Sequence, residues 1–297
     1  MNFRIEGIVP AMVTPFTKNG EFVDFDRVGP LASWLVKRGA AGLFVCGTTG
    51  EGHLMSADER MAVLEEVIST VGKKAKVIAQ TGCLDTATTI ELTRHAQECG
   101  AAAVAVVAPA FYSYDNEALT KFYKDVAGSV KEFPVMLYNI PGCAKNAISP
   151  ALAIQLANEV ENIVGTKDSS GNMIELTQLI AGAPKGFNVI NGVDEYHYQA
   201  FCCGTKACVS GPANVVIDLH VGIYENVKKN NLKKAWSFQA KLAAACTIFQ
   251  YGRKLSLFKE GMRLRGFDPG CVRPPQCELN AAEKKELAKK MEQAGLI

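Results

Sequence analysis

One lysine stands where a mostly apolar segment of the chain gives way to small polar residues. The segment begins at Ile163 and reaches Lys167, and Asp168, Ser169 and Ser170 follow it. A lysine at the end of a buried strand is partly desolvated, which disfavours its charged form. A neutral amine can attack a ketone and form a Schiff base. The alternative is a structural lysine that pairs with a carboxylate such as that of Asp168.

Hydroxyl groups that could assist such a lysine follow two other apolar segments. Thr48 and Thr49 lie in the sequence Gly-Thr-Thr-Gly, and Tyr138 lies near the end of a third segment. A tyrosine hydroxyl can carry protons to and from a reacting carbon and oxygen. Threonine hydroxyls and close backbone N–H groups suit a carboxylate. Together these residues favour imine chemistry on a 2-keto acid, although a packed tyrosine and an ordinary tight turn are the simpler alternatives.

These residues need a scaffold that brings strand ends together. Eight predicted strands alternate with helices, at residues 8–16, 41–46, 77–82, 103–108, 134–139, 163–167, 187–191 and 206–210. Such alternation is typical of a parallel sheet with right-handed crossovers, and eight units in about 225 residues suit a closed barrel. We predict an α/β fold, a (β/α)8 TIM barrel over residues 1–228. A doubly wound sheet is the alternative, but the first strand ends in Thr-Pro-Phe without its usual glycine-rich loop.

The rest of the chain has a different pattern. Residues 229–297 contain predicted helices at 233–251, 255–265 and 281–294 with no strands between them, so we expect a C-terminal helical region packed on the barrel. Two helix starts carry specific signals. Ser56 and Glu59 form a capping box, and Ser149 is an N-cap followed by Pro150 at the first helical position.

Composition narrows the function. The chain has 32 basic and 30 acidic residues, and no basic stripe that would indicate nucleic acid or an anionic membrane surface. The start has no apolar signal region, and no apolar run is long enough to span a membrane. Ten cysteines occur without a C-x-x-C motif, mostly in apolar segments. These features favour a reduced, cytoplasmic protein that acts on a small molecule.

Three motifs together resemble one known family. They are Gly-Thr-Thr-Gly-Glu at 47–51, Tyr-Asn-Ile-Pro at 138–141 and Gly-Thr-Lys-Asp at 165–168. The chain is similar to the pyruvate-dependent class I aldolases that include N-acetylneuraminate lyase and dihydrodipicolinate synthase. The resemblance covers nearly the whole chain. It implies a barrel with C-terminal helices and a homotetramer built as a dimer of dimers.

The resemblance also implies roles for individual residues. Lys167 would form the Schiff base with pyruvate, and Tyr138 would donate and accept protons. Thr48 would link Tyr138 to a tyrosine of the neighbouring subunit. Thr49 would bind the pyruvate carboxylate, and the backbone at Val209 would line the pyruvate site. No metal or other cofactor is implied.

Two departures from the family pattern bear on the substrate and on the proton relay. Dihydrodipicolinate synthases have an arginine shortly after the Tyr-Asn-x-Pro motif, where this chain has Gly142, Cys143 and Ala144. At the position of the cross-subunit tyrosine the chain has Phe111, followed by Tyr112. Either Tyr112 replaces the missing tyrosine after a small shift, or the relay is incomplete.

The residues that follow the seventh predicted strand indicate a sugar acid as the substrate. Gly192, Asp194 and Glu195 resemble the neuraminate lyase segment whose acidic pair binds sugar hydroxyls, and carboxylates accept hydrogen bonds from polyols. The alternative is that both acids cap the next helix. The serine that neuraminate lyases have after the eighth strand is replaced by Gly211. A shorter 2-keto-3-deoxy sugar acid therefore fits as well as N-acetylneuraminate.

These observations lead to one main hypothesis and three alternatives. The main hypothesis is an aldolase or lyase that interconverts a 2-keto acid with pyruvate and an aldehyde. A 4-hydroxy-tetrahydrodipicolinate synthase or a dehydratase would use the same imine. A barrel that binds a keto acid without turning it over is the alternative from another class. A metal-dependent aldolase is disfavoured, because the four histidines are scattered without ligand spacing.

Overall fold

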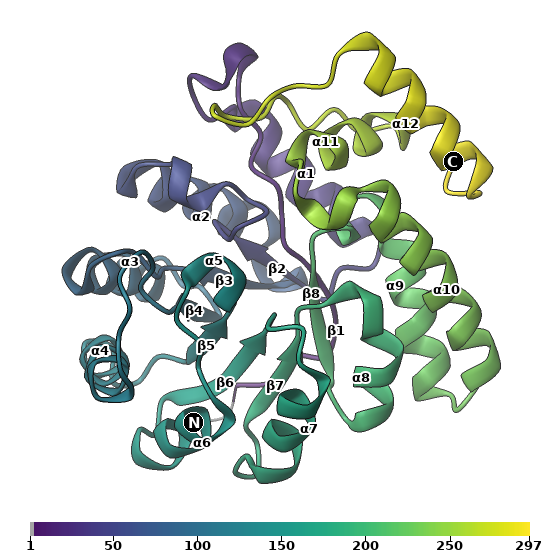
Figure 1. The fold of residues 1–297 in the computed structure, drawn as a ribbon. Helices are drawn as coiled ribbons and strands as arrows, with labels where there is room; N and C mark the ends of the chain where they lie inside the picture. The colour runs from purple at the N-terminus through teal and green to yellow at the C-terminus, as the bar shows by residue number, and fades with distance from the viewer. Residues whose placement is uncertain (1–2) are drawn as a thin grey trace.

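The computed structural model describes residues 3–297, and its centre is one sheet of eight parallel strands. The strands are β1 Gly7–Pro10, β2 Gly42–Val45, β3 Lys76–Gln80, β4 Ala103–Val107, β5 Val135–Asn139, β6 Ile163–Asp168, β7 Asn188–Asn191 and β8 Ala207–Ser210. Each pairs with its neighbours in the order β1-β8-β7-β6-β5-β4-β3-β2. Backbone hydrogen bonds from Met12 to Phe44 (2.9 Å) and from Ala41 to Ile8 (2.8 Å) join the first strand to the second. The predicted TIM barrel is confirmed (Figure 1).

Helices surround the barrel and follow its strands. They are α1 Phe25–Lys37, α2 Ala57–Val71, α3 Thr86–Glu98, α4 Asn116–Gly128, α5 Pro141–Ala144, α6 Pro150–Glu159, α7 Met173–Gly182, α8 His197–Cys203, α9 Ala213–Lys228, α10 Leu232–Ile248, α11 Leu255–Leu264 and α12 Ala281–Gln293. The last three are the C-terminal helices, and the division of the chain at residue 228 stays a prediction. Ser56 and Glu59 form the expected capping box, and Ser149 caps α6 with Pro150 in its first turn.

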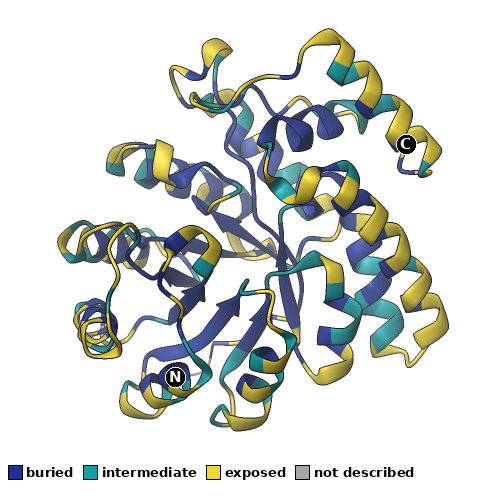
Figure 2. Cartoon of the chain, in the orientation of Figure 1, coloured by how far each residue is buried: buried dark blue, intermediate teal, exposed yellow. Residues whose placement is uncertain are grey.

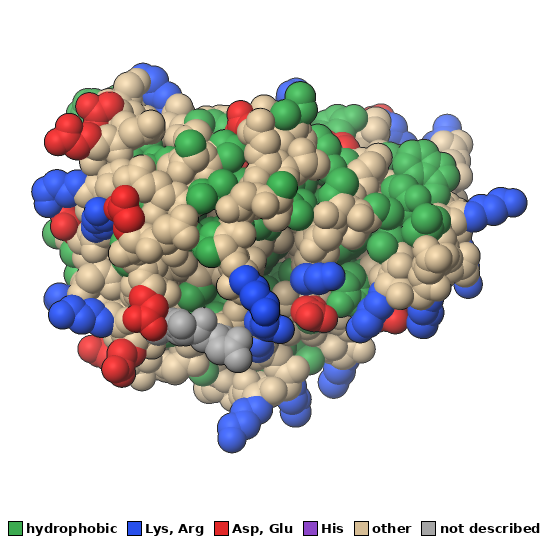
Figure 3. Space-filling model, turned by 90° about the horizontal axis from the view of Figure 1, so that it is seen from below, with side chains coloured by type: hydrophobic (Ala, Val, Ile, Leu, Met, Phe, Trp, Pro, Cys, Tyr) green, Lys and Arg blue, Asp and Glu red, His purple; other side chains and the backbone are tan. Residues whose placement is uncertain are grey.

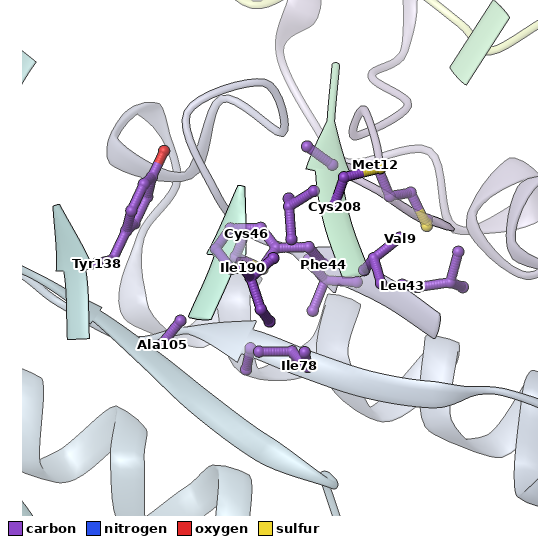
Figure 4. Close-up of a cluster of buried hydrophobic side chains, with 14 of the residues drawn as sticks. Val9, Met12, Leu43, Phe44, Cys46, Ile78, Ala105, Tyr138, Ile190 and Cys208 are labelled. Carbon is purple, nitrogen blue, oxygen red and sulfur yellow. The ribbon is translucent and has the colours of Figure 1, made fainter. Parts of the chain in front are cut away.

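The strands are buried because helices cover their outer faces and side chains fill the interior. Figure 2 shows this as dark strands enclosed by helices that carry most of the exposed residues. The interior contains Phe44, Ile78, Ala105 and Ile190, each at most 1% exposed. Figure 4 shows Tyr138 at the side of this apolar cluster, with its hydroxyl pointing away from it. The interior is therefore a packed core, and polar groups collect at the strand ends.

The first strand is shorter than predicted. It ends at Pro10, whereas the predicted strand continued to residue 16. Beyond it the chain makes only isolated bridges, in which Ala11 pairs with Phe44 and Phe16 with both Val23 and Cys271. Apolar residues continue past the strand because this segment is buried against the C-terminal region, so hydrophobicity alone overestimated its length.

The surface agrees with the balanced charge of the chain. Acidic and basic side chains occur together on the face drawn in Figure 3. All ten cysteines are free thiols. Among the described residues, no helix combines the length and apolarity that crossing a membrane requires.

Candidate active site

Lys167 lies at the carboxyl end of β6, and the sheet register sets it beside Tyr138. The two residues are direct partners across the β5–β6 pair. Lys167 is only 5% exposed, and its Nζ lies 3.7 Å from the centre of the Tyr138 ring and 4.3 Å from that of Phe44. Within residues 3–297 no carboxylate lies within ion-pair distance of this nitrogen. The amine is therefore held against two aromatic faces, at the strand ends where barrel enzymes have their chemistry.

Asp168 does not fill the structural role considered for it. Its Oδ1 accepts a hydrogen bond from Nδ2 of Asn139 at 2.8 Å, and its Oδ2 accepts one from the hydroxyl of Ser170 at 3.0 Å. Burial raises the pKa of this carboxyl group, and the two neutral donors only partly oppose that shift. The interpretation of Lys167 as the ion-pair partner of Asp168 is wrong, because the aspartate faces neutral donors.

The hydroxyl of Tyr138 points towards the turn after β2. It lies 3.4 Å from Oγ1 of Thr48, and the edge of the Tyr138 ring packs on Phe44 with an interplanar angle of 82°. Thr49 is next in the turn, and Val209 lies in β8 in register with Val9. Phe44 contacts both Lys167 and Tyr138, yet sequence reasoning missed it because an apolar residue inside a strand carries no chemical signal.

The turn after β2 is held in place from the far end of the chain. Glu51 adopts a left-handed conformation (φ 56°) and is buried. Its Oε1 lies 2.9 Å from Nζ of Lys259, and its Oε2 accepts the backbone N–H of Arg273 at 2.8 Å. Burial raises the pKa of Glu51 and lowers that of Lys259, so each charge depends on the other. Sequence reasoning missed Lys259. Its apolar neighbours Leu257 and Phe258 were the only sign in the sequence that this lysine is buried.

The chain has a known family. A family model described as the dihydrodipicolinate synthetase family matches residues 4–294. The 4-hydroxy-tetrahydrodipicolinate synthase of Bacillus subtilis is 32% identical over 289 residues, which cover 97% of this chain and 98% of that protein. The chain belongs to the dihydrodipicolinate synthetase family. Its members are pyruvate-dependent class I aldolases, so the protein is an enzyme of the carbon–carbon lyase class.

Solved structures agree with this assignment. The dihydrodipicolinate synthase of Bacillus anthracis superposes with a TM-score of 0.92 at 32% identity, covering 98% of each chain. YagE of Escherichia coli K12, a member of the same family solved in complex with pyruvate, has a TM-score of 0.93 at 29% identity. The latter match covers 98% of this chain and 99% of YagE.

Gly192 makes room for Lys167. A Cβ built on Gly192 would lie 2.1 Å from Oγ of Ser169 and 3.2 Å from Cε of Lys167. Its N–H donates to the carbonyl of Asp168 at 2.7 Å, which ties the turn after β7 to the end of β6. Any side chain here must displace Ser169, the lysine or the turn itself.

We expect Gly192→Ala to lower the rate at which pyruvate is trapped on the enzyme by about tenfold or more, because small misplacements of reacting groups are costly. The control is Gly142→Ala, where a Cβ would meet nothing within 4 Å. Trapping rates with borohydride and unfolding temperatures of both variants check this. Equal rates in the two variants would show that Gly192 has no part in placing the lysine.

The two acids of the turn after β7 have different surroundings. Oδ1 of Asp194 lies 3.0 Å from Nε2 of His197 and 3.0 Å from Nε2 of His220. Glu195 is exposed, and burial of part of its side chain raises its pKa. Neither acid caps a helix, since the turn and α8 both start without a side-chain cap. The expectation that the histidines are scattered is wrong, because His197 and His220 meet at Asp194.

Phe111 and Tyr112 lie on the surface of this single chain. Phe111 has a positive φ of 75° and is 75% exposed, and Tyr112 is 65% exposed. Asn146 holds this segment by donating to the carbonyl of Tyr112 at 2.7 Å. In residues 3–297 no hydrogen bond joins the Tyr112 hydroxyl to Thr48. The chain therefore brings together Lys167, Tyr138 and Thr48, and leaves Phe111 and Tyr112 facing outward.

Proposed function

We propose that Lys167 forms a Schiff base with pyruvate and that Tyr138 carries the protons of the reaction. The observation behind this is the Lys167 amine, buried against the rings of Tyr138 and Phe44 with no carboxylate partner among residues 3–297. The amine attacks the pyruvate carbonyl carbon, and the oxygen leaves as water after protonation. Thr49 binds the pyruvate carboxylate, and the backbone at Val209 lines the same subsite.

The imine then serves as an electron sink for carbon–carbon chemistry. Loss of a methyl proton from the pyruvyl imine gives an enamine, which attacks an aldehyde, and hydrolysis of the product imine frees Lys167. Cleavage of a 2-keto acid follows these steps in reverse. The Tyr138 hydroxyl, 3.4 Å from Thr48, can accept and return each proton. In an assembled enzyme, Thr48 either passes protons on to Tyr112 of a neighbouring subunit or is the last group of the proton relay.

For the second substrate we propose a neutral hydroxyaldehyde, so that the full substrate is a 2-keto-3-deoxy sugar acid. Gly142, Cys143 and Ala144 stand where the family's synthases have an arginine, so the chain has no guanidinium fork there for a second carboxylate. Glu195 is exposed at the rim and can accept hydrogen bonds from hydroxyl groups. The names of the B. subtilis and Methanopyrus kandleri relatives favour the alternative, a 4-hydroxy-tetrahydrodipicolinate synthase.

We further propose a cytoplasmic homotetramer. Leu84, Phe111 and Tyr112 are large apolar side chains that are each more than half exposed, which suits an interface between copies of this chain. Ten free cysteines suit a reducing compartment. Sedimentation of the purified protein tests the assembly, and a monomer would remove the support for a relay between subunits.

Incubation with pyruvate, reduction with borohydride and peptide mass spectrometry test the chemistry. We expect one pyruvyl adduct on Lys167, and turnover that survives EDTA. A panel that includes glyceraldehyde and aspartate semialdehyde then separates the two acceptor classes, and we expect the hydroxyaldehyde to react faster. Binding of pyruvate without an adduct would replace the aldolase by a keto-acid-binding barrel, and faster reaction of aspartate semialdehyde would favour the synthase.

A further inference from the structure

Three buried side chains and the mostly buried Asp194 meet beside the turn after β7, outside the pair formed by Lys167 and Tyr138. Oδ1 of Asp194 accepts hydrogen bonds from Nε2 of His197 and Nε2 of His220, each at 3.0 Å, and from the hydroxyl of Ser210. The side chains of both histidines are 0% exposed. We call these four residues the Asp194 cluster. It joins the turn after β7 to β8, α8 and α9, which lie next to one another in Figure 1.

The proton on His197 can be assigned from its neighbour Asn191. The Asn191 amide is oriented by the backbone of Val193, because its Oδ1 accepts the Val193 N–H at 3.1 Å and its Nδ2 donates to the Val193 carbonyl at 2.8 Å. Nδ2 also lies 2.6 Å from Nδ1 of His197, which must therefore accept. A neutral ring carries its proton on the other nitrogen, so Nε2 of His197 donates to Asp194.

The same count of hydrogen-bond donors and acceptors places a proton on both ring nitrogens of His220. Its Nδ1 lies 3.0 Å from the carbonyl of Val216 and must donate to it. Its Nε2 faces Oδ1 of Asp194 at 3.0 Å and Oγ of Ser210 at 2.7 Å. Ser210 has one hydroxyl proton, which goes to the carboxylate, so Nε2 of His220 faces two acceptors. Without a proton on Nε2 this contact would be repulsive, whereas an imidazolium satisfies every atom.

The surroundings leave the cluster as one carboxylate and one imidazolium. Burial raises the pKa values of the Cys208 and Cys246 thiols near Asp194, which stay neutral. Burial alone would raise the pKa of Asp194, but the two histidines outweigh burial and hold that pKa below its usual range. A divalent cation would need free lone pairs on both Nε2 atoms, and both carry protons. The grouping is therefore a hydrogen-bonded ion pair, and a divalent cation would bind there only by displacing these protons.

Two glycines that are neighbours of cluster residues in the sequence lie close to residues of the proposed pyruvate site. Gly192, two residues before Asp194, would place a Cβ 3.2 Å from Cε of Lys167. Gly211, directly after Ser210, would place a Cβ 3.2 Å from Oγ1 of Thr49. The turn is also held from outside, since Gln239 of α10 donates to the Asp194 carbonyl at 2.9 Å. Movement of either turn would change the space around the lysine or the threonine.

We propose that Asp194, charge-paired with an imidazolium at His220, is a positioning residue that holds these two turns against Lys167 and Thr49. It acts on the pyruvate half of the reaction and recognises no substrate hydroxyl, which leaves Glu195 as the acid available to the aldehyde. This inference rests on the proposed function for its kinetic consequence. The charge state of His220 stands independently of that function.

NMR of the wild-type protein labelled with ¹⁵N-histidine tests the charge state, and the chain has only four histidines to assign. From the hydrogen-bond geometry we expect both ring nitrogens of His220 to be protonated, and His197 to carry a proton on Nε2 alone. Added zinc should leave both signals unchanged. A neutral His220, or signals that shift with one equivalent of zinc, would overturn the assignment.

Kinetics of His220→Gln test the positioning role. We expect the KM for pyruvate to rise about tenfold, a scale typical of remote misplacement, with the KM for the aldehyde unchanged. His95→Gln is the control, because His95 pairs with Glu65 at the surface of α3.

The double variant Asp194→Asn/His220→Gln removes both charges and should recover part of the stability that the single variant loses. A changed aldehyde KM or aldehyde preference, with the pyruvate KM unaltered, would assign Asp194 to substrate recognition instead. If the wild-type enzyme traps no pyruvate, the proposed function fails while the NMR result still decides the charge state.

Discussion

Lys167→Met should abolish trapping of pyruvate and lower turnover by about 10⁴-fold or more, the scale seen when a covalent nucleophile is removed from other enzymes. Methionine nearly matches the length of lysine and keeps the contact with the rings of Phe44 and Tyr138, so the variant removes the amine without opening a cavity. It also removes a buried amine that has no carboxylate partner within residues 3–297. The variant should therefore unfold at the same temperature as the wild type or at a higher one.

The matched control is Lys206→Met, directly before β8 and at the opposite end of the barrel from the strand ends that carry the site. The Lys206 side chain is exposed, so this change should alter neither trapping nor turnover. Mass spectrometry of the trapped adduct and steady-state kinetics make the comparison. A Lys167→Met enzyme that still forms a reducible pyruvyl adduct would move the Schiff base to another lysine and discard the assignment made here.

Lys259→Met should destabilise the fold by about 3–5 kcal/mol, the cost of breaking a buried ion pair by removing one partner. The change leaves the buried carboxylate of Glu51 without its cation, and two backbone carbonyls, of Thr14 and Cys271, lose their donor. Because Glu51 ends the turn that carries Thr48 and Thr49, the KM for pyruvate should rise as well. Urea unfolding monitored by circular dichroism measures the first effect, and kinetics measure the second.

Lys254→Met is the control for this prediction. Lys254 pairs with Glu283 at 2.5 Å, but both side chains are partly exposed and solvent screens the pair, so the loss should be much smaller than for Lys259→Met. Adding Glu51→Gln to Lys259→Met should restore part of the lost stability, because the unpaired charge is gone. If the two lysine variants have the same unfolding free energy, Glu51 and Lys259 are not a stabilising pair.

The barrel could be predicted because the sequence patterns that indicate its strands and helix starts each span only a few neighbouring residues. Each strand is a short apolar segment such as 103–107, and the helix starts at Ser56 and Ser149 follow rules of a few residues. The end of β1 could not be predicted, since the buried apolar residues after Pro10 contact segments remote in sequence, as Phe16 does in its bridge with Cys271. Local patterns report that a residue is buried, but not what buries it.

The same limit explains which parts of the candidate site could be predicted from the sequence and which could not. The strand-end rule places Lys167, Tyr138 and Thr48 at one rim, and the structure brings them together. The pairing of Glu51 with Lys259 spans 208 residues, and that of Asp194 with His220 spans 26, and neither spacing matches a motif. Asp194 shows the consequence, because a carboxylate that seemed free from sequence is occupied by two imidazoles in the fold.

The direct pairing of Tyr138 with Lys167 across β5 and β6 separates two parts of the enzyme that can change independently. Backbone hydrogen bonds of the sheet fix the geometry of these two groups, whereas the residues that we propose for the aldehyde come from turns such as the one with Glu195. Substitutions in the turns can alter which aldehyde is accepted without disturbing the pair. A scaffold of this kind lets one reaction on pyruvate be inherited unchanged while its second substrate diversifies, and directed evolution of new specificities should begin in those turns.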